Sequence, residues 1–395
     1  MKQSLYLLWL EGLDPERLES IPALAQLKAR GIDVRLSPLP PVEDGQCTYQ
    51  ALTGMGPGKF GRFDAVRPEG YRVVQESGVP EGVQGAELPE LLRGRKLATA
   101  SLEARSAADL AKLAGQELDF ALVRLPGAGQ LPIEELETLV QRALELATPS
   151  GHVLVLTSVQ QSAPVSLVNI NNFLVDVGLM EASEPSASGE IVWSETLAYS
   201  LGNGQIWVNL RGRELQGVVS SGREYQEVCE ALVRELKTNW LDPQTQQPVV
   251  ARAFKKDELY TGEYLFKAPD LVVAFAPGYA PSSRGAALQL DDQSVLPTGQ
   301  SGPAKTSEAR LLGSGSALAA GVTTSARLID VAPAVLYLLD QAVPQRMDGE
   351  VNLSLFNDEY RRRTPLKQIE DEADLLSDEE EGLIVDRLRD LGYLG

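Results

Sequence analysis

Short apolar runs alternate with amphipathic segments through the first half of the chain, and this alternation constrains the fold more than any other feature. Leu5–Leu10, Phe120–Leu125 and His152–Thr157 have the length and composition of buried strands, whereas Ile133–Ala147 has the apolar spacing of a long helix. Strands that alternate with helices pair mostly in parallel and carry helices on both faces of the sheet. The sequence therefore predicts an α/β fold with a mostly parallel central sheet.

The loops at the carboxyl ends of these strands are where we expect functional residues, because ligands bind at that edge of a parallel sheet. The loops that follow predicted strands are Glu11–Asp14, Pro40–Gly45, Pro126–Gln130 and Thr157–Gln160. Between the first two loops, apolar residues at helical spacing from Leu18 to Leu27 predict one helix that Gly31 closes.

The pattern changes after residue 165 and predicts an inserted cap. There Ile206–Leu210 alternates like an exposed edge strand, and Leu271–Phe275 is expected to return to the main sheet. After Asn357 the chain becomes a charged tail that ends in a predicted amphipathic helix, Ser377–Leu391, which either packs on its own domain or docks a partner. The predicted division is core at 1–165 and 266–357, cap at 166–265 and tail at 358–395.

Charge and cysteine content exclude several classes of protein. The chain of 395 residues has a net charge of −19, which argues against binding to nucleic acid or to anionic membranes. Cys47 and Cys229 are far apart and indicate neither a disulfide framework nor a zinc knuckle. The run Leu5–Leu10 is too short for a signal-peptide core or a membrane span, and no later run reaches the length of a membrane span. We therefore expect a cytoplasmic protein without a membrane span.

The chain contains a single histidine, His152, which limits its metal chemistry. Zinc and related ions favour imidazole nitrogen alongside carboxylate, so one histidine cannot build an imidazole-rich two-metal site. His152 begins a predicted strand rather than ending one, and we expect it to be a boundary or surface residue.

Seven segments in order resemble the type I phosphodiesterase and nucleotide pyrophosphatase branch of the alkaline-phosphatase superfamily. The segments are Leu7–Leu13, Thr53–Gly61, Val168–Leu179, Trp193–Glu214, Glu258–Leu271, Ile329–Gly349 and Arg387–Tyr393. Each segment is weak alone, but together they span nearly the whole chain. The resemblance implies a three-layer α/β/α sandwich with an inserted cap subdomain.

The same resemblance implies a site with two divalent metals such as zinc, and most of its ligands are missing here. Glu11 falls on the family's first aspartate ligand and Asp44 on its nucleophile, whereas Ser158 and Val159 replace an aspartate and a histidine ligand. Three further positions offer no ligand: the loop Pro126–Gln130, Phe60 in place of a turn histidine, and the stretch Lys305–Gly313, which has no histidine. No confident catalytic, metal or cofactor-binding residue is therefore predicted.

Three functions follow from this pattern. The first is a pseudoenzyme that serves as a protein-binding, scaffold or regulatory subunit, with an active paralogue or a second copy among its candidate partners. The second is an atypical metal-dependent phosphodiesterase or phosphatase in which Glu11 and Asp44 hold one Mg²⁺ or Mn²⁺. The third is a phosphate or nucleotide binder without turnover, which would use the glycines and Lys59 of Gly54–Gly61.

Overall fold

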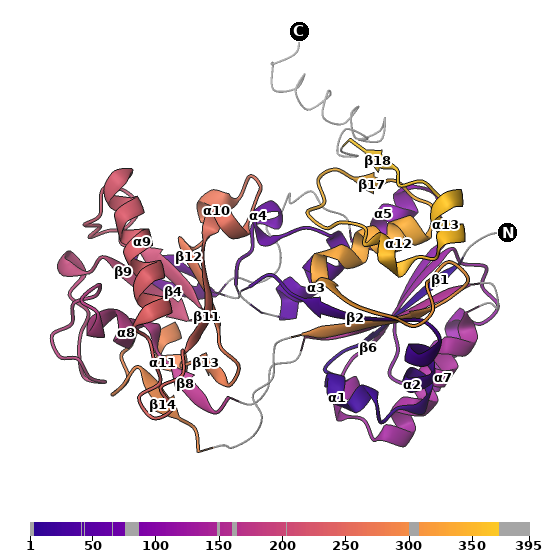
Figure 1. Cartoon of the computed structure of the whole chain (residues 1–395), viewed down its shortest axis with the longest axis horizontal. Coiled ribbons are helices and arrows are strands. Elements are labelled where there is room, and N and C mark those ends of the chain that lie inside the picture. The colour runs from indigo at the N-terminus through magenta and orange to yellow at the C-terminus, as the bar shows by residue number, and fades with distance from the viewer. Residues whose placement is uncertain are drawn as a thin grey trace, which may run out of the picture.

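The computed structural model describes residues 4–40, 42, 44–64, 66–75, 87–147, 151–159, 164–202, 204–299 and 308–370. The predicted tail helix Ser377–Leu391, residue Gln160 and residues 305–307 lie outside these ranges. Figure 1 shows two units side by side, one built on the central sheet and one built on smaller sheets. Within the described residues, no helix combines the length and the apolar character needed to cross a membrane.

The central sheet has seven strands in the order β16-β2-β15-β7-β1-β6-β5. All neighbouring pairs are parallel except those that involve β15, which runs antiparallel to both β2 and β7. The predicted α/β class with a mostly parallel sheet is therefore confirmed. The bounds are β1 (Leu5–Leu10), β2 (Ile32–Ser37), β5 (Thr99–Glu103), β6 (Phe120–Leu125), β7 (His152–Thr157), β15 (Ala309–Ser314) and β16 (Val322–Arg327).

Alternate residues of β1 face two separate apolar clusters, and this alternation creates three layers. Leu7 and Trp9 join the cluster that includes Ala51 and Leu91, while Leu8 and Leu10 join the one that includes Leu139. Figure 1 shows helices on both faces of the sheet. One face carries α3 (Asp44–Thr53), α5 (Leu88–Gly94), α12 (Val331–Leu338) and α13 (Asp358–Arg363), and the other carries α1 (Pro15–Leu18), α2 (Pro22–Arg30) and α7 (Ile133–Leu146). The short helix α6 (Ala107–Leu110) belongs to the second face, because its Leu110 is in the same cluster as Leu139.

The single helix predicted from Leu18 to Leu27 is wrong, because the chain forms α1 and α2 with a break between them. Pro22 occupies the first turn of α2, where its missing N–H leaves no helical hydrogen bond unmade. The apolar spacing continues across the break, so the pattern alone did not reveal the interruption.

The second unit contains a four-stranded sheet in the order β11-β12-β10-β9 and a three-stranded sheet in the order β13-β8-β14. Its strands are β8 (Ser166–Val168), β9 (Ala198–Gly202), β10 (Gln205–Val208), β11 (Val250–Lys255), β12 (Leu271–Phe275), β13 (Tyr279–Pro281) and β14 (Val295–Pro297). Its helices are α8 (Ile170–Asp176), α9 (Arg223–Thr238), α10 (Lys256–Leu259) and α11 (Ser283–Ala286).

Two predictions about this unit are wrong. Leu271–Phe275 does not return to the main sheet, because it pairs as β12 with β10 and β11. The strand β10 is not an exposed edge, since it lies between β9 and β12 with all four residues buried. An apolar run predicts burial, but it does not say which sheet buries it. The proposed limits of core, cap and tail stay predictions.

A hairpin of β3 (Val66–Glu69) and β4 (Arg72–Gln75) packs on the second unit. Tyr71 at its tip has a φ of 64°, a backbone conformation that side chains rarely adopt. Its ring stacks on Trp193 with centroids 3.8 Å apart, and its hydroxyl donates to Asn209 at 2.6 Å. These contacts offset the local strain and hold the hairpin on the second unit. The remaining short elements are α4 (Pro57–Phe60), β17 (Val343–Pro344) and β18 (Gln368–Ile369).

His152 is fully buried, so the prediction of a boundary or surface residue is wrong. Neither ring nitrogen has a hydrogen-bond partner among the described residues, and the ring packs against the backbone of Gly315. Burial in this setting lowers the pKa of His152 to about 4.

We predict that His152 makes the protein less stable in mild acid. In the unfolded chain the pKa of His152 is near its ordinary value, so the unfolded state takes up protons first as the pH falls below about 6.5. The free energy of unfolding should drop by roughly 2–3 kcal/mol between pH 7 and pH 4.5 through this residue alone. Urea unfolding across this range, compared with the non-titrating His152→Met, checks the sign. An equal loss in both proteins would contradict the assignment.

Candidate functional site

Three loops meet at the carboxyl ends of β1, β6 and β7, as the parallel sheet predicts. The backbone N–H of Glu11 donates to the carbonyl of Leu125 at 3.1 Å, and that of Ser158 donates to the carbonyl of Leu10 at 3.3 Å. The loops after β6 and β7 therefore lie against the two sides of the loop after β1. This edge of the sheet is where an α/β fold places a ligand.

Glu11 lies in this region, and its carboxylate is already paired. The Nε–H of Arg124 donates to Glu11 Oε1 at 2.5 Å, and the guanidinium lies 5.6 Å from the centre of the Trp9 ring. Both side chains are partly exposed, 26% for Glu11 and 40% for Arg124. A metal ion at Glu11 would therefore have to displace or repel a fixed cation.

Ser158 and Val159 offer no metal ligand in the positions that the resemblance gives to aspartate and histidine. The Ser158 hydroxyl oxygen accepts a hydrogen bond from the backbone N–H of Gly12 at 3.2 Å, and this bond holds the loop after β1. Val159 is only 6% exposed and belongs to the same apolar cluster as Leu156 and Cys47. The Ser158 hydroxyl is thus a loop contact, and Val159 is part of the core.

The loop after β6 is shaped so that a ligand side chain has no room at Gly129. A Cβ atom on Gly129 would lie 1.8 Å from the carbonyl oxygen of Gly12. The guanidinium of Arg17 donates to the carbonyls of Gly129 and Leu131, so the loop is also fixed from its other side. An aspartate or histidine there would force the β1 loop to move.

The remaining positions to which the resemblance assigns a nucleophile or a histidine are Asp44, Phe60 and the start of β15. Asp44 is the first residue of α3, and its role as a nucleophile or ligand stays a prediction. Phe60 is fully buried, with its ring 5.4 Å from that of Tyr49. Where the last ligand histidine was expected, β15 carries Arg310, whose guanidinium pairs with the buried Asp33. Among the residues described, no three His, Cys, Asp or Glu side chains are placed to share a metal ion. Within the described part of the chain, the side chains at these positions do not together make up a two-metal site.

Sequence reasoning missed the charged neighbours of Glu11. The pKa of Glu87 is raised, chiefly by burial and also by the nearby Glu90, although Arg124 acts in the opposite direction. Burial, Glu87 and Glu90 also raise the pKa of Tyr49. These side chains come from the start of α5, from α3 and from β6. The one available signal was Arg124, a cation inside an otherwise apolar strand.

The Gly54–Gly61 loop, the proposed phosphate binder, is occupied by contacts within the chain. Asp348 accepts the Gly56 backbone N–H at 2.8 Å and pairs with the Lys59 ammonium at 2.8 Å. Lys59 also donates to the carbonyl of Arg346 at 2.6 Å. A Cβ on Gly58 would lie 2.2 Å from the carbonyl oxygen of Thr261, so the loop is packed closely against the second unit. These contacts hold the loop in place, so its role in this structure is structural.

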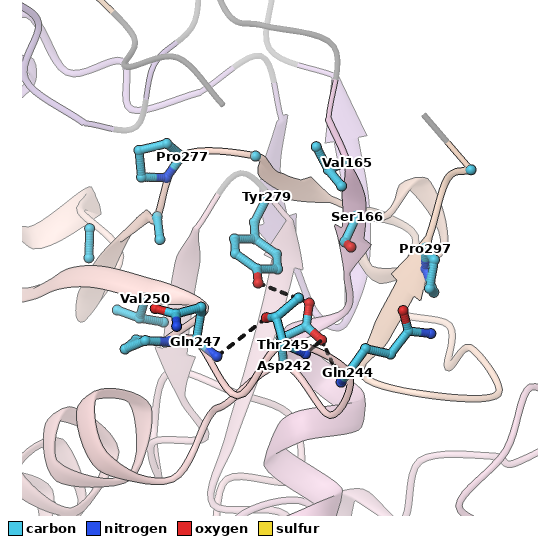
Figure 2. A pocket seen from close by; sticks show the side chains of 15 residues that line it. Val165, Ser166, Asp242, Gln244, Thr245, Gln247, Val250, Pro277, Tyr279 and Pro297 are labelled. Atoms are coloured by element: carbon cyan, nitrogen blue, oxygen red, sulfur yellow. Dashed lines mark hydrogen bonds between the residues drawn. The ribbon is translucent and has the colours of Figure 1, made fainter. Parts of the chain in front are cut away.

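A separate pocket of about 840 Å³ lies in the second unit (Figure 2). It is lined by residues of β8, β11, β13 and β14, by the turn 242–248 and by residues 276–278 after β12. No motif in the sequence predicted it, because its walls come from four segments far apart in the chain.

Comparisons with known proteins relate the chain to others by fold alone. No family model matches the sequence, and no curated protein sequence matches it. Among solved structures, human ectonucleotide pyrophosphatase/phosphodiesterase 5 superposes with a TM-score of 0.54 and 12% identity, over 90% of this chain and 100% of that one. An inactive variant of the murine protein in complex with AMP gives a TM-score of 0.53 and 11% identity, over the same shares of both chains. At this identity the likeness establishes a shared α/β fold and no activity.

We predict that position 159 does not accept a metal-binding side chain. Val159→His should lower the free energy of unfolding by roughly 2 kcal/mol relative to Val159→Leu, because a similar volume then carries an unpaired polar ring in the core. Urea unfolding of both variants measures the difference. Recovery of the histidine variant on addition of equimolar Zn²⁺ would show instead that a metal site remains within reach.

Proposed function

We propose that this chain is a catalytically inactive relative of the type I phosphodiesterases that binds another protein as a scaffold or regulatory subunit. The observation that carries this proposal is the ion pair between Glu11 and Arg124. In the family that the sequence resembles, a metal would bind the carboxylate at this position. Here the carboxylate neutralises an arginine, and the neighbouring ligand positions Ser158 and Val159 serve the loop and the core.

The charge around Glu11 supports the loss of phosphoryl chemistry. Two divalent metals stabilise the charge on the attacking and leaving oxygens of a phosphate ester. One guanidinium next to Glu11 and Glu87 supplies far less positive charge, and Arg124 is held by its carboxylate partner. A phosphate ester at this edge of the sheet would meet carboxylates without the cations that normally screen them.

The single-metal alternative, in which Glu11 and Asp44 hold Mg²⁺ or Mn²⁺, is decided by metal content and turnover together. We expect the purified protein to contain no stoichiometric divalent metal and to hydrolyse phosphate mono- and diesters no faster than the Glu11→Ala/Asp44→Ala double variant. The double variant is the control, because it reports contaminating phosphatase activity. Stoichiometric metal with turnover that disappears in Asp44→Ala would reverse the proposal.

The partner is expected to be a protein with a basic surface. The net charge of −19 favours such a partner through electrostatic complementarity, which acts mainly on the association rate. Phe266 is 70% exposed on the second unit, and exposed aromatic side chains often become buried at interfaces. Phe266 is therefore the contact residue that we propose first.

We predict that the tagged full-length chain recovers a partner from its native cell in an amount that falls as salt is raised. Phe266→Ser should reduce this recovery, whereas Leu353→Ser, a change at another exposed apolar residue, should not. Light scattering of the purified chain separates a second copy from a different protein as the partner. Equal recovery with all three baits would rule out Phe266 as the contact, and a salt-independent amount would rule out the electrostatic preference.

A further inference from the structure

The pocket in the second unit has the size of a small-molecule site, at about 840 Å³. Its lining includes the apolar residues Val250, Ala251 and Pro277, and polar side chains lie among the apolar ones (Figure 2). Apolar surface combined with a few polar groups is the usual arrangement of sites that bind small organic ligands. The pocket is distinct from the loops at the ends of β1, β6 and β7.

The charge of the pocket excludes two classes of ligand. Of the fifteen lining residues that the structure describes, only Asp242 is charged, and none is Lys, Arg or His. Its carboxylate accepts the backbone N–H groups of Gln244 at 2.8 Å and Thr245 at 3.1 Å, and the hydroxyl of Tyr279 at 2.9 Å. An anion such as a phosphate ester would face this carboxylate without a cation. A cationic ligand would find the negative charge of Asp242 already stabilised by three hydrogen-bond donors. It would also meet one aromatic ring, whereas sites for quaternary ammonium ligands surround the cation with several.

The groups that remain available both donate and accept hydrogen bonds. Ser166 is only 5% exposed, and its hydroxyl, which lines the pocket, makes no hydrogen bond within the described part of the chain. Gln244 and Gln247 lie in the same turn as Asp242, and both residues are exposed and line the pocket. Hydroxyls and carboxamides of this kind match ligand hydroxyl groups, which also donate and accept.

Tyr279 adds a flat apolar surface to these polar groups. Its hydroxyl is fixed by Asp242, so the ring is held in one orientation and its half-buried body lines the pocket (Figure 2). A fixed ring contributes contact area at little cost in conformational entropy. The C–H face of a sugar ring is apolar while its rim is hydroxylated, and both parts have a counterpart here.

We propose that this pocket binds a neutral saccharide of one or two sugar rings, stacked on Tyr279 and hydrogen-bonded by Ser166, Gln244 and Gln247. Binding requires no metal and no phosphate, so it is independent of the ligand positions lost around Glu11. It is equally independent of the protein partner proposed above, because Phe266 does not line the pocket.

The test is saturation-transfer NMR of the full-length protein with glucose, galactose, N-acetylglucosamine, maltose and cellobiose as probes. We expect at least one probe to bind at millimolar concentration, with an affinity that does not change with salt, because no net charge is paired. Tyr279→Ala should weaken that binding at least about tenfold, since it removes the stacking surface. Gln247→Ala should weaken it less, and because Gln247 is exposed this variant keeps the fold intact.

Two controls make the outcome decisive. Ile133→Ser changes a partly exposed residue of α7 in the first unit and should bind the same probe as well as the parent protein. AMP and choline serve as the anionic and cationic alternatives. Silence of all five sugars, binding unchanged in both Tyr279→Ala and Gln247→Ala, or AMP or choline displacing the bound sugar would each overturn the proposal.

Discussion

Strand β1 has a parallel neighbour on each side, and everything at the functional edge of the sheet depends on that arrangement. Because β6 and β7 end level with β1, the loops that follow all three must share one small volume. The backbones of Gly12 and Gly129 fill the centre of it so closely that no side chain fits at Gly129. In a two-metal enzyme the same volume would hold ions and their ligands. Here a side chain at Gly129 would require the β1 loop to move.

The packing also explains how the carboxylates at this edge are accommodated. Carboxylates gathered without metals would repel one another, and Glu11, Glu87 and Glu90 all lie near this edge. Arg124 provides one compensating charge, and the Trp9 ring beneath it adds a favourable cation–π contact. Because the pair is partly exposed, its net contribution to stability is modest, on the order of 1 kcal/mol or less. Its larger effect is to keep the carboxylate of Glu11 from acting as a free ligand.

The sequence predicted this edge better than it predicted the second unit. The parallel sheet and the meeting of Glu11, Ser158 and the loop after β6 follow from local patterns and from simple topology. Arg124 was missed because a cation in a strand does not reveal which carboxylate it will meet. The sheet that contains β12 and the burial of His152 depend on contacts between distant segments, which no local pattern encodes. The pocket was missed for the same reason.

The charge of the chain links the two places where binding is proposed. An enzyme that acts on phosphate esters needs local positive charge to attract and stabilise its substrate, and metals or basic side chains supply it. At the edge of the sheet the charge of Arg124 is cancelled by Glu11, and among the described residues the pocket is lined by one carboxylate and no cation. In a chain with a net charge of −19, screening at physiological salt limits repulsion to about 8 Å, so local charge decides what can bind. The charge at both places therefore agrees with the two proposals, a neutral ligand in the pocket and a protein partner with a basic surface.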